Sequence, residues 1–422
     1  MTALPPVIVE ETFGNTGVDD FDTFAQWEAA LPVDLTREHS GDTCRLTSPG
    51  NNQIYLGDSA VATDAWYNGM VVEWNGEQRR ITDYVGASKL ATVDTLNGSA
   101  ATFGGTPQAG NAYTVHPVVM KGLGHAHNVN ALMTIAGQTT DADAYVWLTA
   151  KPGASWRDTA TPTTEEIDWN DARLRNDHSP GSTNQRLLQV NTPHTLVERL
   201  QIRAGGQERA HQIEANDGIT FRDCLIVDST SNLQRRTPLL TGATFVNCVL
   251  FYNSTRTDPG HVISAKPGCT LVNCAVIRST SIAAAPVEIV NREGNCSFRS
   301  CAFYGNWNVF QSGSTGTIEV DKCATSLSSF GTISSGSGNI TSGDNTLDME
   351  DLSGTGGDAR AKAGGNLESA ADVESETDYG GGRVDVFGNA RHASAPTIGA
   401  FELPSSGGGP IRKPTLSLLG VG

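Results

Sequence analysis

The feature that most constrains this chain is a short phrase that recurs five times between residues 218 and 323. Its copies are Gly218-Ile-Thr-Phe-Arg-Asp-Cys224, Gly242-Ala-Thr-Phe-Val-Asn-Cys248, Gly268-Cys-Thr-Leu-Val-Asn-Cys274, Asn295-Cys-Ser-Phe-Arg-Ser-Cys301 and Thr317-Ile-Glu-Val-Asp-Lys-Cys323. The final cysteines follow one another after 24, 26, 27 and 22 residues. Self-similarity at such a period indicates a solenoid, in which each repeat buries its apolar face only against its neighbours.

The pattern inside each repeat indicates strands rather than helices. Phe221, Cys224 and Ile226 lie too close together for a pair of helices, and a polar pair interrupts them. A second apolar position recurs halfway through the repeats, at Ile213, Leu239, Ile263, Ile289, Phe310 and Ile333. Two or three short strands in about 24 residues predict an all-β fold, a parallel β-helix whose turns stack about 4.8 Å apart. Like side chains would then form columns inside the coil.

The cysteines fit this interior. Five of the eight occupy one repeat position, which favours a column of small apolar thiols over a metal cluster, a redox pair or a disulfide framework. Cys269 and Cys296 share another position and would lie on adjacent turns, so a disulfide between them stays open. No C-x-x-C or Cys/His spacing supports a metal site. We therefore expect neither a metal nor a cofactor.

Charge and hydropathy limit the partners. The 422 residues carry a net charge of -17, with a pI of about 4.9, which disfavours nucleic acid as a partner. The first residues lack the basic and apolar regions of an export signal, and no run of 18 apolar residues occurs. The sequence therefore predicts neither ordinary export nor membrane insertion.

Residues 1–63 are predicted to contain a short helix and the first turn of the coil. Phe24, Trp27 and Leu31 fall at helical spacing, with Thr23 and Gln26 placed as a capping box. Because an open solenoid end exposes unpaired strand edges, we interpret this helix as a cap over that end, with its tryptophan in the core. The apolar segments 44–47 and 53–56 would form the first turn.

Residues 64–118 follow a different pattern, in which alternating strands are joined by short turns. Strands are predicted at 70–74, 77–82, 90–93 and 112–116, and they indicate a small antiparallel β domain inserted into the coil. The string from Tyr67-Asn-Gly-Met through Arg79-Arg-Ile-Thr-Asp-Tyr-Val-Gly-Ala-Ser-Lys to Ala109-Gly-Asn-Ala-Tyr-Thr-Val resembles a small β module of tailed-phage structural proteins.

Residues 119–403 are assigned to the coil, and they carry a second resemblance. Val384-Asp-Val-Phe-Gly-Asn-Ala-Arg391 and Ala395-Pro-Thr-Ile-Gly-Ala-Phe-Glu402 resemble the closing turn of many bacterial and phage right-handed β-helix proteins of the pectate-lyase-like type. The opening helix and the strand Trp147-Leu-Thr-Ala-Lys-Pro-Gly153 are similar to the same family. The resemblance implies a right-handed coil and, because such virion subunits are mostly trimeric, a homotrimer.

Residues 404–422 begin with the linker Pro404-Ser-Ser-Gly-Gly-Gly-Pro410 and continue as an apolar tail. The tail has nothing of its own to pack on, which predicts docking on a neighbouring subunit or another virion protein; fraying is the alternative. The residues predicted to dock are Ile411, Leu416, Leu418 and Leu419.

Aromatic and charged side chains on the outside of the coil are the candidates for contact with host glycans. The polar loop from Ser155 to Pro180 offers tryptophans as sugar-stacking faces, although these could equally pack the loop onto the coil. A polar cluster and an aromatic pair on later turns add to them, although charged loops are more often solvated faces. The candidates are Trp156, Trp169, Arg235, Arg236, Asp258, His261, Tyr304 and Trp307.

An enzymatic site would need acidic residues stacked on the outside of the coil. Lyases use carboxylates that hold Ca²⁺ beside a basic residue, and glycosidases use two facing carboxylates. The residues before the repeat cysteines, interpreted as outward, are Asp223, Asn247, Asn273, Ser300 and Lys322. This series contains a single acid and resembles a polar column that stabilises turns, so we assign no catalytic residues.

Together, the residues and the resemblances predict a structural protein on the surface of a tailed-phage particle, as a head decoration or as a tail spike or fibre. It would be assembled in the host cytoplasm, would be non-enzymatic, and would contact host surface polysaccharide. The alternative is a β-helix depolymerase, a lyase or glycosidase that acts on this polysaccharide. A non-catalytic sugar-binding module, which would retain glycan without cleaving it, is the third hypothesis.

Overall fold

The computed structural model describes residues 4–96, 102–126, 129, 131–155, 174–176, 187–204, 213–216, 218–228, 239–252, 260–265, 268–278, 287–291, 295–304, 309–312, 317–330, 333–341, 349–351, 358–361, 366–367, 371, 391 and 397–400. The chain divides into two compact units. The first comprises residues 1–125, 134–151 and 190–196, and the second comprises residues 126–133, 152–189 and 197–422.

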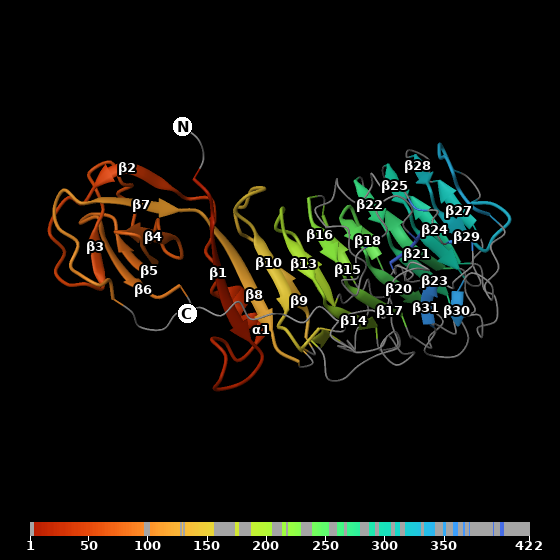
Figure 1. The fold of residues 1–422 in the computed structure, drawn as a ribbon, viewed down its shortest axis with the longest axis horizontal. Coiled ribbons are helices and arrows are strands. Elements are labelled where there is room, and N and C mark those ends of the chain that lie inside the picture. The colour runs from red at the N-terminus through yellow and green to blue at the C-terminus, as the bar shows by residue number, and fades with distance from the viewer. Residues whose placement is uncertain are drawn as a thin grey trace. The chain divides into compact units, whose positions relative to one another are not determined.

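Three parallel sheets, each with one strand per repeat, build the second unit (Figure 1). Within this unit, the first sheet contributes, in order, β13 (Leu196–Glu198), β16 (Thr220–Arg222), β19 (Thr244–Val246), β22 (Cys269–Val272), β25 (Cys296–Arg299) and β28 (Ile318–Asp321). The second contains β11 (Arg175–Asn176), β14 (Gln201–Ala204), β17 (Leu225–Asp228), β20 (Val249–Tyr252), β23 (Ala275–Arg278), β26 (Ala302–Tyr304) and β29 (Ala324–Thr325). The third contains β12 (Leu188–Val190), β15 (Ile213–Ala215), β18 (Leu239–Thr241), β21 (Gly260–Ala265), β24 (Val287–Asn291) and β27 (Val309–Ser312). The predicted parallel β-helix is confirmed.

In-register pairing stacks the repeated side chains into interior columns. Phe221 pairs with Phe245, which pairs with Leu271, and the two phenylalanine rings stack with centroids 4.8 Å apart. The five repeat-final cysteines are fully buried and free. The thiols of the first four donate to carbonyl oxygens of the preceding turn, as Cys274 Sγ does to the Phe245 oxygen at 3.5 Å. The predicted thiol column is confirmed.

Cys269 and Cys296 form a second, shorter column on the first sheet. They pair directly between β22 and β25, and both are free thiols. Burial raises the pKa of both thiols, that of Cys296 to about 12. Because both thiols are free, the disulfide left open by the sequence is not formed.

A residue with a left-handed backbone turns each repeat from the first sheet into the second. Its φ angle lies between +51° and +55° in five successive turns, at Asp223, Asn247, Asn273, Ser300 and Lys322. The first four of these side chains are at most 2% exposed. The column predicted to face outward is therefore covered at these four positions, and Arg391 from the C-terminal part of the chain contacts Asn247. The corner favours asparagine and aspartate because their short polar side chains tolerate the left-handed conformation.

The second sheet is buried on both faces. Side chains alternate along its strands, and Phe303 turns inward onto Phe298, with ring centroids 5.5 Å apart. The opposite, outer face packs against Leu367, Ile398 and Ala400 from the C-terminal part of the chain. The outer face consists of Leu225, Val227, Val249, Phe251, Ala275, Ile277, Ala302, Tyr304 and Ala324.

The C-terminal residues that cover this face are tied to the corner of the coil. The Gly399 amide donates to the Ser300 carbonyl at 2.9 Å, and the Ile398 amide donates to the Leu367 carbonyl at 2.9 Å. Gly399 has a φ of +100°, and a Cβ at this position would lie 3.2 Å from the Ala302 Cβ. We call residues 391 and 397–400 the strap. The described residues of the phrase that resembles a closing turn, 391 and 397–400, thus pack on the outside of the coil. Farther along the chain from β29, β30 (Met349–Asp351) pairs antiparallel with β31 (Asp358–Ala361).

Three parallel strands and one helix begin the first unit. β1 (Val7–Phe13) pairs with β8 (Val118–Gly124), which pairs with β10 (Val146–Ala150); β9 (Met133–Ile135) lies between them in sequence. The helix α1 (Phe24–Ala29) has the predicted capping box. Trp27 is fully buried, as predicted, and a Cβ at Gly122 would lie 2.5 Å from its indole. Only glycine fits beneath this ring. The role of α1 as an end cap stays a prediction.

The rest of the first unit is an antiparallel sheet in the order β2-β7-β4-β5-β6-β3. Its strands are β2 (His39–Thr43), β3 (Gln53–Tyr55), β4 (Val71–Trp74), β5 (Glu77–Val85), β6 (Leu90–Asp94) and β7 (Ala112–His116). The sheet starts earlier than predicted, because β3, expected in the first turn of the coil, pairs antiparallel with β6. Short strands of this kind do not reveal from sequence alone which sheet they join. The domain boundaries stay predictions.

Candidate functional site

Most of the predicted contact residues lie outside the described part of the chain. These are Trp156, Trp169, Arg235, Arg236, Asp258 and Trp307 among the glycan candidates, and Ile411, Leu416, Leu418 and Leu419 of the tail. The backbone of His261 belongs to β21, and its side chain also lies outside the description. These assignments remain predictions.

Tyr304 is the one predicted glycan contact whose side chain is described, and the prediction is wrong. The tyrosine is fully buried in the outer face of the second sheet. Its position in β26 places it on the same face of the sheet as Ala302. The backbone of Gly399 packs closely against Ala302 on this face. A ring covered in this way offers no surface to a sugar. The sequence did not reveal this, because the strap arrives from nearly 100 residues farther along the chain.

The first sheet of the coil keeps a partly solvated outer face with a column of hydroxyl groups. Thr220 pairs with Thr244, Thr244 with Thr270, and Thr270 with Ser297. All four side chains are half-buried, and the next position in the column, Glu319, is exposed. We call these four residues the hydroxyl column. It runs along the coil axis for three strand spacings, about 14 Å.

Two arginines lie beside the hydroxyl column, each two residues farther along its strand and therefore on the same outer face. Arg222 follows Thr220, and Arg299 follows Ser297; we call them the arginine pair. The Arg222 Nη1 lies 3.8 Å from the buried carboxylate of Glu198, too far for a hydrogen bond. The Nε of both arginines is buried and lacks a hydrogen-bond partner within the described residues.

A second polar cluster forms just past the carboxyl ends of β1, β8 and β10. The His125 Nε2 lies 2.8 Å from Asp19 Oδ1 and 2.7 Å from Lys151 Nζ. One ring nitrogen cannot donate to a carboxylate and accept from an ammonium group at the same time, so the two groups compete for it. This cluster was not predicted from the sequence, because its residues follow strands that are far apart in the chain.

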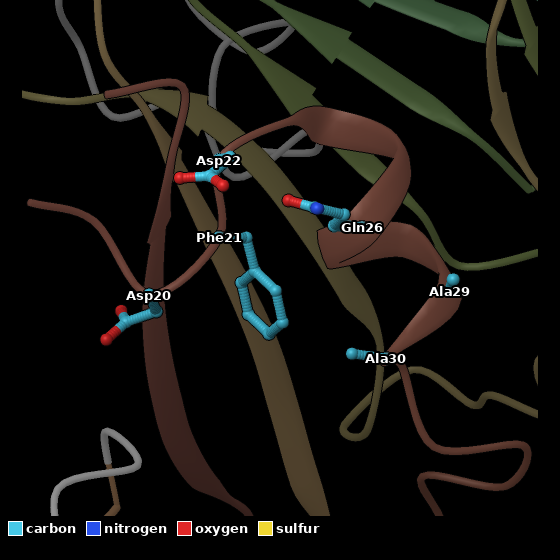
Figure 2. A pocket seen from close by; sticks show the side chains of 6 residues that line it. All are labelled: Asp20, Phe21, Asp22, Gln26, Ala29 and Ala30. Atoms are coloured by element: carbon cyan, nitrogen blue, oxygen red, sulfur yellow. The ribbon is translucent and has the colours of Figure 1, made fainter. Parts of the chain in front are cut away.

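An open hollow of about 530 Å³ lies beside α1, between the helix and the loop that precedes it (Figure 2). Figure 2 shows Gln26 extending from the helix on the side of Asp22. Both carboxylates that line the hollow are used by the loop itself. Asp20 accepts from the Thr12 amide at 2.7 Å, and Asp22 accepts from the Gly17 amide at 3.3 Å. The hollow is therefore a feature of the loop's own folding.

Ser59, His39 and Asp42 have the composition of a nucleophile triad but lack its geometry. The His39 Nε2 lies 3.4 Å from both Ser59 Oγ and Asp42 Oδ2, whereas a triad uses the two ring nitrogens separately. The serine hydroxyl donates directly to Asp42, and this bond is the main reason that the pKa of Asp42 is lowered. The cluster fastens the loop that contains Ser59 and does not activate the serine.

The described residues contain neither a metal-binding cluster nor a membrane-spanning helix. No group of three or more His, Cys, Asp or Glu side chains there is placed to hold a metal ion. Likewise, no helix in that part of the chain is long and apolar enough to cross a membrane.

Comparison with known proteins gives a weak likeness to a solved structure. No protein-family model and no curated protein matches the chain. Among solved structures, the chain is similar to the crystal structure of the tailspike protein gp49 from Pseudomonas phage LKA1, at 11% sequence identity and a TM-score of 0.15. The match covers 68% of this chain and 46% of that chain, so it spans less than half of the tailspike. A likeness at this level supports no inference about function.

Proposed function

We propose that the protein is a structural component of the surface of a tailed-phage particle, assembled as a homotrimer in the host cytoplasm. Its coil would be the rigid body of a head decoration or a tail spike or fibre. Residues 404–422 would dock it on another virion protein. The exposed surface of the coil would then bind host surface polysaccharide and would not catalyse a reaction.

The observation that carries this proposal is the antiparallel sheet in the first unit. The residues that resemble a phage β module, from Tyr67 to Val115, contribute β4, β5, β6 and β7 of that sheet. The combination of a compact β module with a β-helix in one chain supports the assignment to a phage particle. The strap adds support, because these described residues of the phrase that resembles a β-helix closing turn are buried and hydrogen-bonded to the coil.

The test is incorporation into particles. Tagged full-length chain and a variant ending at residue 403 are expressed in infected host cells, and purified particles are examined by immunogold electron microscopy. The full chain is expected on the particle surface and the truncation is expected in the soluble fraction only. Absence of the full chain from particles would overturn the proposal, and equal incorporation of both would overturn the docking role of the tail.

Oligomeric state and enzymatic activity are tested on the purified full chain. Light scattering coupled to size-exclusion chromatography is expected to give three times the 44.5 kDa chain mass. Incubation with host capsule or lipopolysaccharide is expected to release no reducing or unsaturated ends. Release of such ends would favour the depolymerase alternative instead.

A further inference from the structure

The strand β1 forms one edge of its parallel sheet. It pairs with β8 on one side and is the first strand in the sheet order. The Val7 amide donates to the Pro117 carbonyl at 2.9 Å, and successive residues of a strand direct their backbone groups to opposite sides. The amides and carbonyls of Ile8, Glu10 and Thr12 therefore face away from β8.

The chain itself closes one end of this edge. The Thr12 amide donates to Asp20 Oδ2 at 2.7 Å, and the Phe21 amide donates to the Thr12 carbonyl at 3.0 Å. Among the described residues, none forms a hydrogen bond with the outward amide or carbonyl of Ile8 or Glu10. We call the backbone of these two residues the open edge. Ile8 is 49% exposed beside it, and an unpaired edge is a template for an added strand.

The hollow beside α1 begins where the edge is closed, since Asp20 and Phe21 line it (Figure 2). Its lining also includes Ala29, Ala30 and the carboxylate of Asp22. Asp20 and Asp22 each accept from the loop through one oxygen, and no described residue donates to the second oxygen. The hollow therefore offers an apolar wall and two carboxylate oxygens, which favour a segment that carries cations.

The C-terminal tail has the matching composition. Residues 404–422 contain Arg412 and Lys413 and no acidic residue, in a chain of net charge -17. Leu416 and Leu418 follow, separated by a serine, which is the alternation of a strand with one apolar face. The tail therefore carries positive charge for the hollow and an apolar face for the exposed isoleucine of β1.

The spacing along the two segments also agrees. A strand rises about 3.3 Å per residue, so Leu418 would lie about 17 Å beyond Lys413, and Ile8 lies about 13 Å from Thr12. A tail strand that runs antiparallel to β1 would bring its basic residues to the hollow and its leucines beside Ile8. The opposite direction would move the basic residues away from both carboxylates.

We propose that residues 411–419 of one copy of this chain pair with the open edge of β1 in a second copy, as an added antiparallel strand. The two basic residues would form ion pairs with Asp20 and Asp22, and the leucines would cover Ile8. This proposal rests on the docking role proposed for the tail and names its receptor as another copy of the chain. The contact joins different surfaces of two copies, so its repetition can close a ring, as the proposed homotrimer requires.

The test is cross-linking of two full-length chains that carry one introduced cysteine each. Because all eight native cysteines are buried, an introduced surface cysteine is the thiol that reacts. Ile8→Cys and Leu418→Cys chains with tags of different length are co-expressed, purified together and treated with a short bismaleimide. A covalent heterodimer is expected on a denaturing gel. In the control, Leu46→Cys replaces Ile8→Cys, at a side chain of similar exposure (48%) in the same unit, and at least about tenfold less heterodimer is expected.

Charge reversal in the tail gives a second measurement, on a chain whose two folded units keep their native sequence. Arg412→Glu with Lys413→Glu is expected to raise the protein concentration needed for association about tenfold, the factor that corresponds to two exposed ion pairs. Arg412→Lys with Lys413→Arg keeps both charges and is expected to associate like the native chain. Light scattering coupled to size-exclusion chromatography over a dilution series measures both variants.

The proposal is overturned if no heterodimer forms, if the Leu46→Cys control gives as much heterodimer, or if charge reversal leaves association unchanged. All three results are obtained with purified protein, so they are independent of particle incorporation, which tests the proposed function. Failure of cross-linking, combined with exclusion of the truncated chain from particles, would place the receptor of the tail on a different virion protein. That result would overturn this proposal and leave the proposed function standing.

Discussion

Arg391 donates from its Nη2 to the Asn247 Oδ1 at 3.2 Å, across 144 residues of sequence. The same guanidinium donates to the carbonyl oxygens of Thr397 at 3.0 Å and Gly399 at 2.8 Å. The arginine is 4% exposed, so it acts in a nearly dry environment. It shapes the strap and joins it to the left-handed corner, and the strap in turn seals the outer face of the second sheet.

Replacing Arg391 with methionine should therefore destabilise the coil. The variant keeps the apolar stem and loses three charge-assisted bonds, so we expect the free energy of unfolding to fall by about 2–4 kcal/mol. Urea unfolding followed by circular dichroism measures the change. Arg45→Met, which removes an exposed ion pair, is the matched control and should change stability by less than about 1 kcal/mol. Equal effects of the two variants would contradict the role given to the strap.

All eight cysteines are buried and free, and this predicts their reactivity. Burial raises the pKa of Cys248 and Cys301 in the thiol column, so the reactive thiolate is scarce as well as inaccessible. Ellman's reagent should therefore label no thiol in the native protein and all eight in guanidinium chloride. Rapid labelling of two or more thiols in the native state would show that the column is open to solvent.

The left-handed corner predicts a specific order of substitutions at Asn273, whose φ is +52°. Asn273→Gly keeps the backbone unstrained, whereas Asn273→Val places a branched side chain where it costs at least about 1–2 kcal/mol more. The melting temperature should fall further for valine than for glycine. At Thr270, an outward strand position three residues earlier, valine should be tolerated. A larger loss for glycine than for valine at Asn273 would contradict the assignment.

The sequence predicted the coil because its repeats are local and in register. The spacing of Phe221, Phe245 and the cysteines was enough to place them in interior columns. Each repeat strand pairs with the equivalent strand of the next repeat, so equivalent residues lie above one another. A different local pattern, the helical spacing of Phe24, Trp27 and Leu31, placed Trp27 in the core.

The strap could not be predicted in the same way. Its contact with Asn247 and with the outer face joins segments that share no repeat, so the burial of Tyr304 had no local signal. The earlier start of the antiparallel sheet has a similar cause, because β3 is only three residues long and its partner β6 lies outside the repeat. In both cases, the burial of Tyr304 and the sheet that β3 joins, the structure depends on contacts between segments that are far apart in the chain.

Glu11 provides the last prediction, which concerns pH. Its carboxylate is 2% exposed on the inner face of β1 and pairs with Arg80 of β5, which ties the antiparallel sheet to the first parallel strand. Burial raises the pKa of Glu11 despite the arginine. A carboxyl with a raised pKa contributes stability that is fully present below its unfolded pKa and is lost as pH rises through the folded value. Glu11→Gln is neutral at every pH, so its melting temperature should rise relative to the native protein as pH increases from about 4 to 8.

Glu10→Gln, which alters the neighbouring exposed carboxylate paired with Lys121 at 2.6 Å, should show a much smaller trend. A native-to-Glu11→Gln difference that stays constant over this range would refute the burial argument.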